Sequence, residues 1–339
     1  MEDLERDIKP IKKLKIIYMS QISNEWNKLY SDKLENVKTV EEADYIIFES
    51  NGDPIHIIEK IKLFLPKNKL VFILSGDQNR HIDNECIWFT NAIKPSGLAS
   101  KQTQIFVTNP AIFKFYNMIV KKTNANANQN ANQNANVNNI ISLERKTDIY
   151  FKGTIWDGMR TDMYNEIVNK PNCEIIKNNN YWKWRCESAI KPTQSQLEET
   201  AYDSYNGILN SKLCLCPKGN GNSSMRIVEA LACGSIPVLI NDFSKPFGFS
   251  LSKGNNAIAL SFDTTKHNWS YIYDECMKLI NNEKRYETMK QKGIEYFKNI
   301  IFGDSKLKDF EMYKNIDTVA FGFSNLIIDK LNELFIQNK

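Results

Sequence analysis

The first half of the chain alternates short apolar runs with a helical pattern. Apolar residues recur at helical spacing over residues 54–65, between two of these runs. The runs themselves have the length of strands and lie at residues 15–20, 44–49, 70–74, 86–90 and 104–108. Continuous apolar strands separated by helices are typical of a parallel sheet covered on both faces. This half is therefore predicted to be an α/β unit.

A second series of the same kind begins near residue 148. Its predicted strands are 148–151, 173–177, 213–216, 236–240 and 257–262. Its predicted helices are 160–168, 195–209, 268–281 and 283–300. The last segment, 306–336, is also mostly helical by its apolar spacing. The pattern thus predicts two α/β units in one chain.

The two series are separated by residues 123–139, which consist almost entirely of Asn, Ala and Gln. Such a segment lacks the apolar side chains of a core, which favours an expanded loop near a domain boundary over a recognition tract. The predicted division is an N-terminal domain at 1–122, a loop or linker at 123–140, a C-terminal domain at 141–304, and a helical segment at 305–339 that packs back on the first domain.

Composition narrows the class of protein. The chain has 339 residues, enough for two domains, and its 42% hydrophobic and 25% charged residues are ordinary for a soluble globular protein. The 44 basic and 40 acidic residues are balanced and spread along the chain, so no nucleic-acid partner is expected.

Targeting signals and cysteines bear on the compartment. The N-terminus is charged and lacks the apolar core of a signal peptide, and no run reaches the roughly 18 apolar residues of a membrane span. The seven cysteines form no C-x-x-C pair, and Cys214 and Cys216 are expected to be buried on one face of a strand. We therefore expect a reducing, cytoplasmic location without a membrane span.

The densest group of chemically useful residues lies at 211–242. A predicted strand leads into a Pro-Lys-Gly turn and a polar loop at 220–224, followed by a helix that ends at Gly234 and a second buried strand. In open α/β sheets, ligands bind at the carboxyl ends of the strands, where this loop must lie. The segment is therefore the first candidate for a binding site.

The loop has the chemistry of an anion site. Gly219 and Gly221 allow the backbone to approach a ligand closely. Ser223 or Ser224 is expected to cap the helix, which leaves other N–H groups of its first turn for a phosphate.

Two charged residues of the following helix refine this interpretation. Arg226 is expected two or three residues into the helix, where its guanidinium suits a diphosphate. Glu229 is three residues further on and shares its face, where a carboxylate suits a ribose diol. Neither G-x-G-x-x-G nor a G-K-[ST] loop occurs here, which disfavours nicotinamide and ATPase functions.

The block resembles the signature of the exostosin-like glycosyltransferases of GT47 type, which include heparan-sulfate polymerases and plant cell-wall transferases. An upstream F-K-G…R segment of that family is also similar, and the strong part of the resemblance covers residues 151–240. The matching residues are Phe151, Lys152, Gly153, Arg160, Ser211, Lys212, Cys214, Leu215, Pro217, Gly219, Ser224, Arg226, Glu229, Ala230, Leu231, Gly234, Ile236, Pro237 and Val238.

The resemblance implies a GT-B fold, with two Rossmann-like, doubly wound domains facing a cleft, the first for the acceptor and the second for the donor. It implies an inverting transfer from a nucleotide-sugar, with UDP favoured, to a glycan or glycoprotein. Arg226 and Arg160 would hold the diphosphate and Glu229 the ribose. The residues expected at the donor are Arg160, Lys218, Gly219, Asn222, Ser223, Ser224, Arg226 and Glu229.

The chain departs from cellular exostosins, which are Golgi membrane proteins, because it shows neither leader nor span. That pattern is expected of an enzyme from a large DNA virus or a bacterium.

No cofactor is expected, and a divalent metal is not expected to be essential. The leaving diphosphate is already supplied with Arg226, Arg160, Lys218 and the helix start near Ser224. The chain has no clear D-x-D segment of the metal-dependent transferases, and its nearest match is Asp83-Asn84-Glu85. Its three histidines show no zinc spacing.

Inversion also needs a base that takes the proton of the acceptor hydroxyl. We expect it at a strand end of the first domain, and favour Asp77, which directly follows the strand at 70–74. His81 in the same loop and Asp53 after the strand at 44–49 are alternatives. Both aspartates also suit turns, and Asp53 suits a helix N-cap.

Two other functions remain open. A fucosyltransferase-like GT-B enzyme with a GDP-sugar also has a helix leading into a G-S-I-P-V strand, but the segment at 213–218 differs from that family's pattern. An inactive glycan-binding module is the second alternative, against which Arg226 and Glu229 argue.

Overall fold

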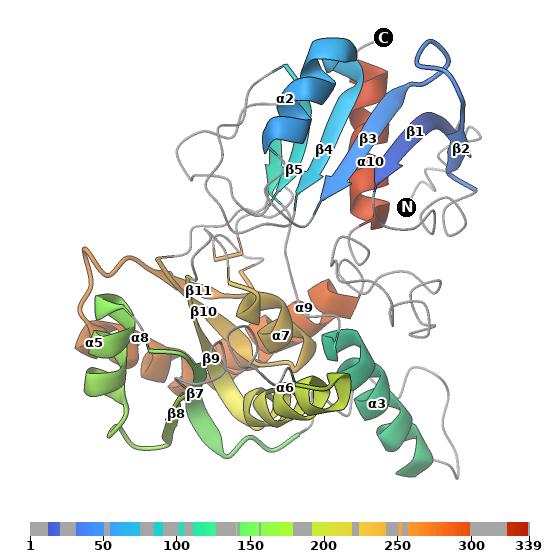
Figure 1. Ribbon diagram of the computed structural model, residues 1–339. Coiled ribbons are helices and arrows are strands. Elements are labelled where there is room, and N and C mark those ends of the chain that lie inside the picture. Colours follow the sequence, from blue (N-terminus) through green and yellow to red (C-terminus); the bar gives the residue numbers. More distant parts are fainter. Residues whose placement is uncertain are drawn as a thin grey trace, which may run out of the picture.

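The computed structural model describes two α/β units, each with its own parallel sheet (Figure 1). The described residues are 13–20, 32–50, 55–74, 85–90, 102–104, 111–126, 140, 143–155, 157–178, 192–218, 224–241, 251–252, 257–298 and 324–337. The two parallel sheets confirm the expected α/β fold class with two separate units.

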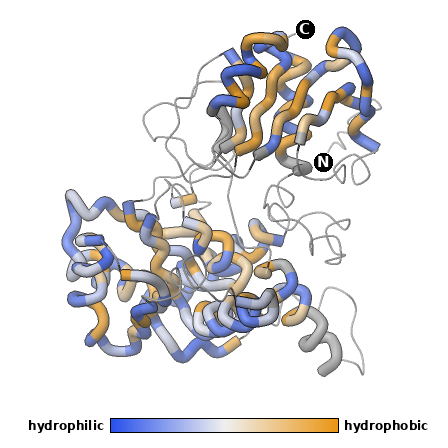
Figure 2. The backbone as a smooth tube through the Cα atoms, in the orientation of Figure 1, coloured by the Kyte–Doolittle hydropathy of each residue, from blue (hydrophilic) through white to orange (hydrophobic). Residues whose placement is uncertain are grey.

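The first sheet has six described strands in the order β2-β1-β3-β4-β5-β6, all parallel. The strands are β1 (Leu14–Ser20), β2 (Leu34–Asn36), β3 (Tyr45–Ser50), β4 (Leu70–Leu74), β5 (Ile87–Thr90) and β6 (Gln102–Gln104). The predicted runs at 70–74 and 86–90 match β4 and β5 closely. Figure 2 shows the hydrophobic colour concentrated on the strands of this sheet, as expected of strands buried on both faces.

Helices cover the two faces of this sheet. The α2 helix (Ile55–Phe64) packs Ile58 and Ile61 onto one face, and a short 3₁₀ turn (Lys67–Lys69) leads into β4. The other face carries α10 (Ser324–Gln337), the last helix of the chain. The hydroxyl of Tyr45 on β3 donates to the carbonyl of Leu331 at 3.0 Å, and the Tyr45 ring meets Phe335 edge to face. The C-terminal helix thus belongs to the layer of the first sheet.

The second sheet has the order β11-β10-β9-β7-β8 and is also parallel. Its described strands are β7 (Thr147–Gly153), β8 (Cys173–Lys177), β9 (Ser211–Pro217), β10 (Ile236–Ile240) and β11 (Leu260–Phe262). Leu213 and Leu215 of β9 face one core cluster, while Cys214 and Cys216 face the other. The prediction that these two cysteines are buried on one face is confirmed.

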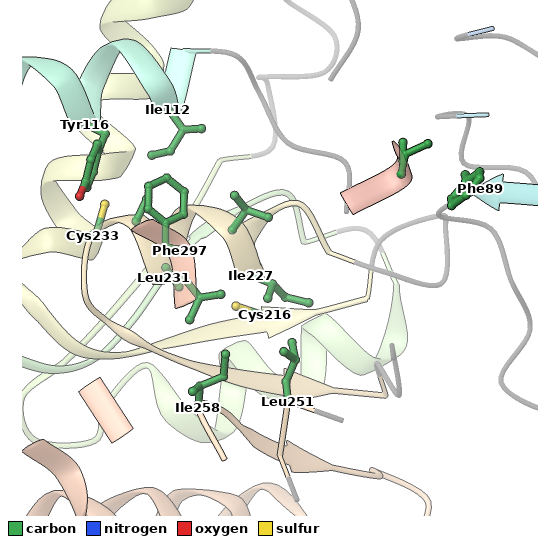
Figure 3. Packing of buried hydrophobic residues seen from close by; sticks show 14 of the residues in the cluster. Phe89, Ile112, Tyr116, Cys216, Ile227, Leu231, Cys233, Leu251, Ile258 and Phe297 are labelled. Carbon is green, nitrogen blue, oxygen red and sulfur yellow. The ribbon is translucent and has the colours of Figure 1, made fainter. Parts of the chain in front are cut away.

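One face of this sheet is covered by α5 (Gly158–Ile167) and α8 (Trp269–Asn281), which share a core cluster with α9 (Glu283–Tyr296). The other carries α6 (Gln194–Leu209) and α7 (Arg226–Ala232). The α3 helix (Ala111–Asn126) also packs here, with the ring centroids of Phe115 and Tyr205 5.0 Å apart. Figure 3 shows this layer, in which Ile112 and Tyr116 of α3 lie near Phe297.

Some elements differ from the sequence pattern. The α3 helix lay in no predicted element, and its last four residues extend into the Asn-rich tract. The predicted strand at 257–262 is shorter, because the N–H groups of Ile258 and Ala259 donate to the carbonyl of Leu251 instead of joining the sheet. Of the strand expected at 104–108, only Gln104 is described, as the last residue of β6, and residues 105–108 lie outside the described residues.

A buried arginine forms hydrogen bonds with main-chain carbonyls near the amino ends of the strands of the second sheet. Arg145 is 7% exposed, and its Nη1 donates to the carbonyls of Leu209 and Ser211 at 3.0 and 2.7 Å. Its Nη2 donates to the carbonyl of Cys233 at 2.9 Å, at the end of α7. Gly234 follows with φ +67°, and a Cβ there would lie 2.8 Å from Nη2 of Arg145. The guanidinium therefore satisfies carbonyls at the ends of α6 and α7.

Both sheets reverse their strand order at one point. In the first sheet β2 lies on one side of β1 and β3 on the other, and in the second sheet β8 and β9 lie on the two sides of β7. The connecting chains therefore diverge between β1 and β3, and between β7 and β9. At the carboxyl ends of such strands an open α/β sheet has its natural crevice for a ligand.

Candidate functional site

The candidate site lies at the switch point of the second sheet, between the carboxyl ends of β7 and β9. The two strands pair in parallel, with Tyr150 opposite Cys214. Thr154 follows the end of β7 and Lys218 follows the end of β9. Loops from both strands therefore leave the sheet side by side.

Arg160 joins these two strand ends. It lies in the first turn of α5, whose N-cap residue Asp157 accepts the Arg160 N–H at 2.7 Å. Its Nη1 donates to the carbonyl of Thr154 at 2.9 Å, and its Nη2 donates to the carbonyl of Lys218 at 3.1 Å. The side chain is thus held at the switch point by both strands, although it is remote from β9 in the sequence.

Arg226 reaches the same strand end from the opposite side. It is the first residue of α7, and its Nη1 donates to the carbonyl of Lys152 at 2.6 Å. Its Nε lies 3.7 Å from Oε2 of Glu229, one turn along the helix. The expected sharing of a helix face by this pair is confirmed by that contact.

Phe151 provides a floor for both guanidinium groups. The Cζ atoms of Arg160 and Arg226 lie 5.9 and 5.4 Å from the centroid of the Phe151 ring. The ring face attracts cations, so it favours this convergence. Gly153 makes room for the ring, because a Cβ at that position would lie 2.8 Å from Cζ of Phe151. This contact explains why the F-K-G segment has a glycine two residues after the phenylalanine.

The positive charges of Arg160 and Arg226 are only partly balanced by the nearby carboxylates of Asp157 and Glu229. Burial lowers the pKa of Arg160, Asp157 opposes that change, and the neighbouring Arg226 lowers the pKa further. Burial raises the pKa of Glu229, and the guanidinium of Arg226 opposes the rise. The Arg226 side chain is 20% exposed and that of Glu229 10%. Two partly buried cations therefore repel each other here, and an anion bound beside them would relieve the repulsion.

Two lysines complete the basic character of the strand ends. The ammonium group of Lys152 pairs with the carboxylate of Asp203 on α6. Lys218 has an exposed side chain, and its N–H donates to the carbonyl of Ile240 at 3.1 Å. Lys218 is thus available to a ligand at the edge of the sheet, whereas Lys152 is already paired.

The start of α7 differs from the expectation. The N-cap position is occupied by Met225, which makes no side-chain cap bond, rather than by Ser223 or Ser224. Arg226 is consequently the first helical residue and not the second or third. The N–H of Ile227 donates to the carbonyl of Ser224 at 3.2 Å, so a tight turn leads into the helix.

Several predicted site residues lie outside the described residues. Among the donor residues these are Gly219, Asn222 and Ser223. The same holds for all three candidate bases, which are Asp77, His81 and Asp53.

The D-x-E segment is described only at Glu85, whose carboxylate pairs with Lys67 at 2.7 Å. Within the described ranges, no three His, Cys, Asp or Glu side chains gather as a metal site would require. The six cysteines in these ranges are free thiols. No described helix is both long and apolar enough to cross a membrane.

The role of Phe151 was missed from the sequence. Its matching position in the F-K-G segment marked the residue, but an aromatic side chain in an apolar strand is ordinarily part of a core. The signal that it supports two cations lies in the pairing of β7 with β9, which no local pattern encodes.

Comparison with protein families agrees with this site. Residues 118–272 match the family model of the exostosin GT47 domain. Over these residues the chain is similar to the exostosin GT47 domain. The matched stretch includes β7, β9 and α7, and with them Phe151, Arg160, Arg226 and Glu229.

Relatives of the exostosin domain match over limited stretches. An exostosin-1 homolog of Caenorhabditis elegans is 26% identical over 125 residues, which are 36% of this chain and 31% of that protein. A protein of Arabidopsis thaliana with the name "Probable glycosyltransferase" is 42% identical over 62 residues, which are 18% of this chain and 12% of that protein. The chain therefore matches less than a third of the length of either relative.

Solved structures resemble the chain more distantly. HepE of Anabaena, solved in complex with UDP-glucose, aligns with 96% of this chain and 99% of its own, with a TM-score of 0.40 and 11% identity. TarM aligns with 76% of this chain and 57% of its own, with a TM-score of 0.31 and 12% identity. The fold assignment therefore rests on the two parallel sheets of the chain itself.

Proposed function

We propose that the protein is an inverting glycosyltransferase that moves a sugar from a nucleotide-sugar, with UDP favoured, to a hydroxyl of a glycan or glycoprotein. The observation that carries the proposal is the convergence of Arg160 and Arg226 over Phe151 at the switch point of the second sheet. The match of this segment to the exostosin GT47 domain supports the reaction class.

In this proposal the second unit binds the donor. The diphosphate lies against the guanidinium groups of Arg160 and Arg226, which form charge-assisted hydrogen bonds with its oxygens. Lys218 and the backbone of the loop that contains Gly219, Asn222, Ser223 and Ser224 complete the contacts. Glu229 accepts hydrogen bonds from the ribose hydroxyls. Its contact with Arg226 supports this arrangement, because it places the carboxylate beside the proposed diphosphate.

The same cations support departure of the leaving group. When the bond from the anomeric carbon to the diphosphate breaks, negative charge grows on the diphosphate oxygens. Preorganised cations at that position stabilise the transition state more than the ground state. A divalent metal is therefore not essential in this proposal, and no cofactor is required.

The first test is nucleotide binding by thermal shift. UDP, GDP and their common sugar conjugates are added to the purified protein with and without Mn²⁺. A nucleotide at about 100 times its Kd stabilises the folded state by ~2.7 kcal/mol, so the melting temperature should rise. We expect UDP compounds to produce the rise without metal. Stabilisation by GDP compounds alone would favour the fucosyltransferase-like alternative.

Two arginine variants make the test specific to the site. Arg226→Ala is expected to abolish the UDP-induced shift, because a charge-assisted hydrogen bond contributes about 1.5–3 kcal/mol. The matched control is Arg285→Ala, which removes an exposed arginine on α9 and should leave the shift unchanged. An undiminished shift in Arg226→Ala would contradict the site assignment. No shift with any nucleotide in the unmodified protein would favour a glycan-binding module.

A further inference from the structure

A buried carboxylate lies at the switch point of the first sheet. Glu49 is the last but one residue of β3, opposite Ser20 at the end of β1 and Ile73 on β4. The strand order of this sheet reverses between β1 and β3. Glu49 thus has the position in the first unit that the two arginines have in the second. Figure 1 shows the carboxyl ends of β3 and β4 on the side of their unit that is nearer the second unit.

The environment of Glu49 is unusual for an acidic residue. The side chain is 3% exposed, and through Oε2 it accepts a hydrogen bond from the hydroxyl of Tyr18 on β1. Its other oxygen, Oε1, is buried and has no hydrogen-bond partner among the described residues. A buried oxygen without a partner costs about 1–3 kcal/mol. A purely structural glutamate would be expected to have both oxygens satisfied.

Apolar groups surround this carboxylate on the elements packed against it. Ile47 of β3 and Ile73 of β4 share its face, and α10 turns buried Ile327, Ile328 and Leu331 toward the sheet. Among the described residues, Tyr18 is the titratable side chain that contacts Glu49.

Charged groups on these elements are engaged elsewhere. On α10, Asp329 pairs with Lys33 at 3.6 Å, and Lys330 pairs with Glu333 at 2.9 Å. The charged residues of α2 lie on the helix that covers the opposite face. Burial therefore dominates and raises the pKa of Glu49 to about 7, while the Tyr18 hydrogen bond acts in the opposite direction. Enzymes bring the pKa of a catalytic glutamate to this range in the same way.

We propose that Glu49 is the catalytic base of the transfer reaction, with Tyr18 as the residue that positions its carboxylate. The inference rests on the proposed glycosyltransferase function. Because Oε1 is buried in this structure, the acceptor must gain access to it when it binds. The acceptor hydroxyl then takes the place of the missing partner at Oε1 and gives its proton to the Glu49 carboxylate. The acceptor oxygen forms a bond to the anomeric carbon, and the bond from that carbon to the diphosphate breaks. The diphosphate leaves with the electron pair and is held by Arg160 and Arg226.

The decisive variant is Glu49→Gln, which keeps the shape of the side chain and removes its basicity. The assay measures UDP release from UDP-glucose, UDP-galactose, UDP-xylose, UDP-N-acetylglucosamine and UDP-glucuronate in the presence of mixed oligosaccharides. We expect kcat to fall by about 10²- to 10⁴-fold, while the UDP-induced thermal shift is retained. The retained shift shows that the variant is folded. Asp44→Asn is the matched control, because Asp44 lies at the amino end of the same strand and accepts the Lys15 N–H at 2.8 Å.

The pH profile separates a base from a structural carboxylate. In the unmodified enzyme kcat/KM should rise with pH through about 7, because the base acts only when it is deprotonated. This limb should be absent in Glu49→Gln and unchanged in Asp44→Asn. Tyr18→Phe should move the limb to higher pH, since the Tyr18 hydrogen bond lowers the pKa of Glu49.

Two results would overturn the proposal. The first is a Glu49→Gln variant whose kcat stays within about twofold of that of the unmodified protein and whose pH profile keeps the limb near 7. In that case Asp77, His81 or Asp53 would again be the candidates for the catalytic base. The other is a limb that stays in place in Tyr18→Phe. Absence of any UDP release by the unmodified protein, with no nucleotide-induced shift, contradicts instead the glycosyltransferase function on which the proposal rests.

Discussion

The two parallel sheets share a strand order around their first strand but carry opposite charges at the switch point. The first sheet has Glu49 there, buried beside Tyr18 and facing apolar side chains. The second has Arg160 and Arg226, which are anchored to main-chain carbonyls and share the ring of Phe151. Each sheet thus places charged groups at its crevice, but one presents a proton acceptor and the other an anion site.

The comparison shows that the same local strand order can carry different side-chain chemistry. A reversal of strand order provides the crevice in both units, because connections diverge there. Which ligand the crevice suits is decided by a few side chains at the strand ends. In the proposed reaction these two chemistries are complementary, since a base must act on the acceptor while cations act on the leaving group. Substitutions at these positions distinguish a functional charge from a structural one.

Arg145 provides a reference for a charge that is purely structural, and its removal should have the largest effect on stability. Arg145→Ala leaves the carbonyls of Leu209, Ser211 and Cys233 without their donor in a buried region. We expect the free energy of unfolding to fall by about 3–5 kcal/mol, as measured by urea denaturation. The folded fraction should bind UDP with unchanged affinity. A loss of UDP affinity in Arg145→Ala would mean that the two edges of the second sheet are coupled.

Glu49 should behave in the opposite way from Arg145, because its charged form opposes folding. Burial raises the pKa of Glu49 from 4.5 to about 7, so stability from the neutral carboxyl is complete below pH 4.5 and is lost as pH rises through 7. This shift corresponds to about 3 kcal/mol. The difference in the free energy of unfolding between Glu49→Gln and the unmodified protein should therefore depend on pH. At pH 8 it should favour the variant by up to about 3 kcal/mol more than it does at pH 4.5.

Unfolding by urea at several pH values measures this difference. Asp44→Asn serves again as the control, because it makes the same kind of change directly before the same strand. If the free energies of unfolding of Glu49→Gln and the unmodified protein instead differ by the same amount at every pH, the fold does not hold the Glu49 carboxyl neutral.

Gly153 tests the cationic switch point with a smaller expected effect. Gly153→Ala places a methyl group 2.8 Å from Cζ of Phe151, so the ring must shift from its present position beside the two guanidinium groups. We expect about a tenfold loss of UDP affinity by titration calorimetry, which corresponds to about 1.4 kcal/mol. Gly158→Ala is the matched control, because a Cβ at Gly158 meets no atom within 4 Å. If the two variants bind UDP with equal affinity, Phe151 has no role in the donor site.

Much of the fold was readable from local pattern. The strand at 236–240 agrees with β10 at both ends, because it is a continuous apolar run with clear boundaries. The strand at 173–177 also agrees with β8 at both ends, although its sequence includes Glu174 and Lys177. The end of the last strand was also right, but its beginning was not. Residues 257–259 are as apolar as a strand, yet two of their N–H groups bond to Leu251. Apolar pattern reports burial and does not report the hydrogen-bond partner.

The candidate site was readable in part. Arg226 and Glu229 form their pair within one helical turn, which sequence spacing determines. The pattern predicts a serine as the N-cap of α7, whereas the structure has Met225 there. Glu49 was placed at the end of a strand but not recognised as a candidate. A single carboxylate in an apolar run carries no sign of its own pKa.

The sequence by itself determined the two α/β series, the polar loop between two buried strands and the spacing of Arg226 and Glu229, because these depend on neighbours along the chain. Only the tertiary structure decided which strand ends lie side by side. Pairing of β7 with β9 brings Arg160, Arg226 and Phe151 together, and pairing of β1 with β3 joins Tyr18 to Glu49. Charge repulsion and desolvation depend on distances in space, so the chemistry of both switch points appears only when the sheets are formed.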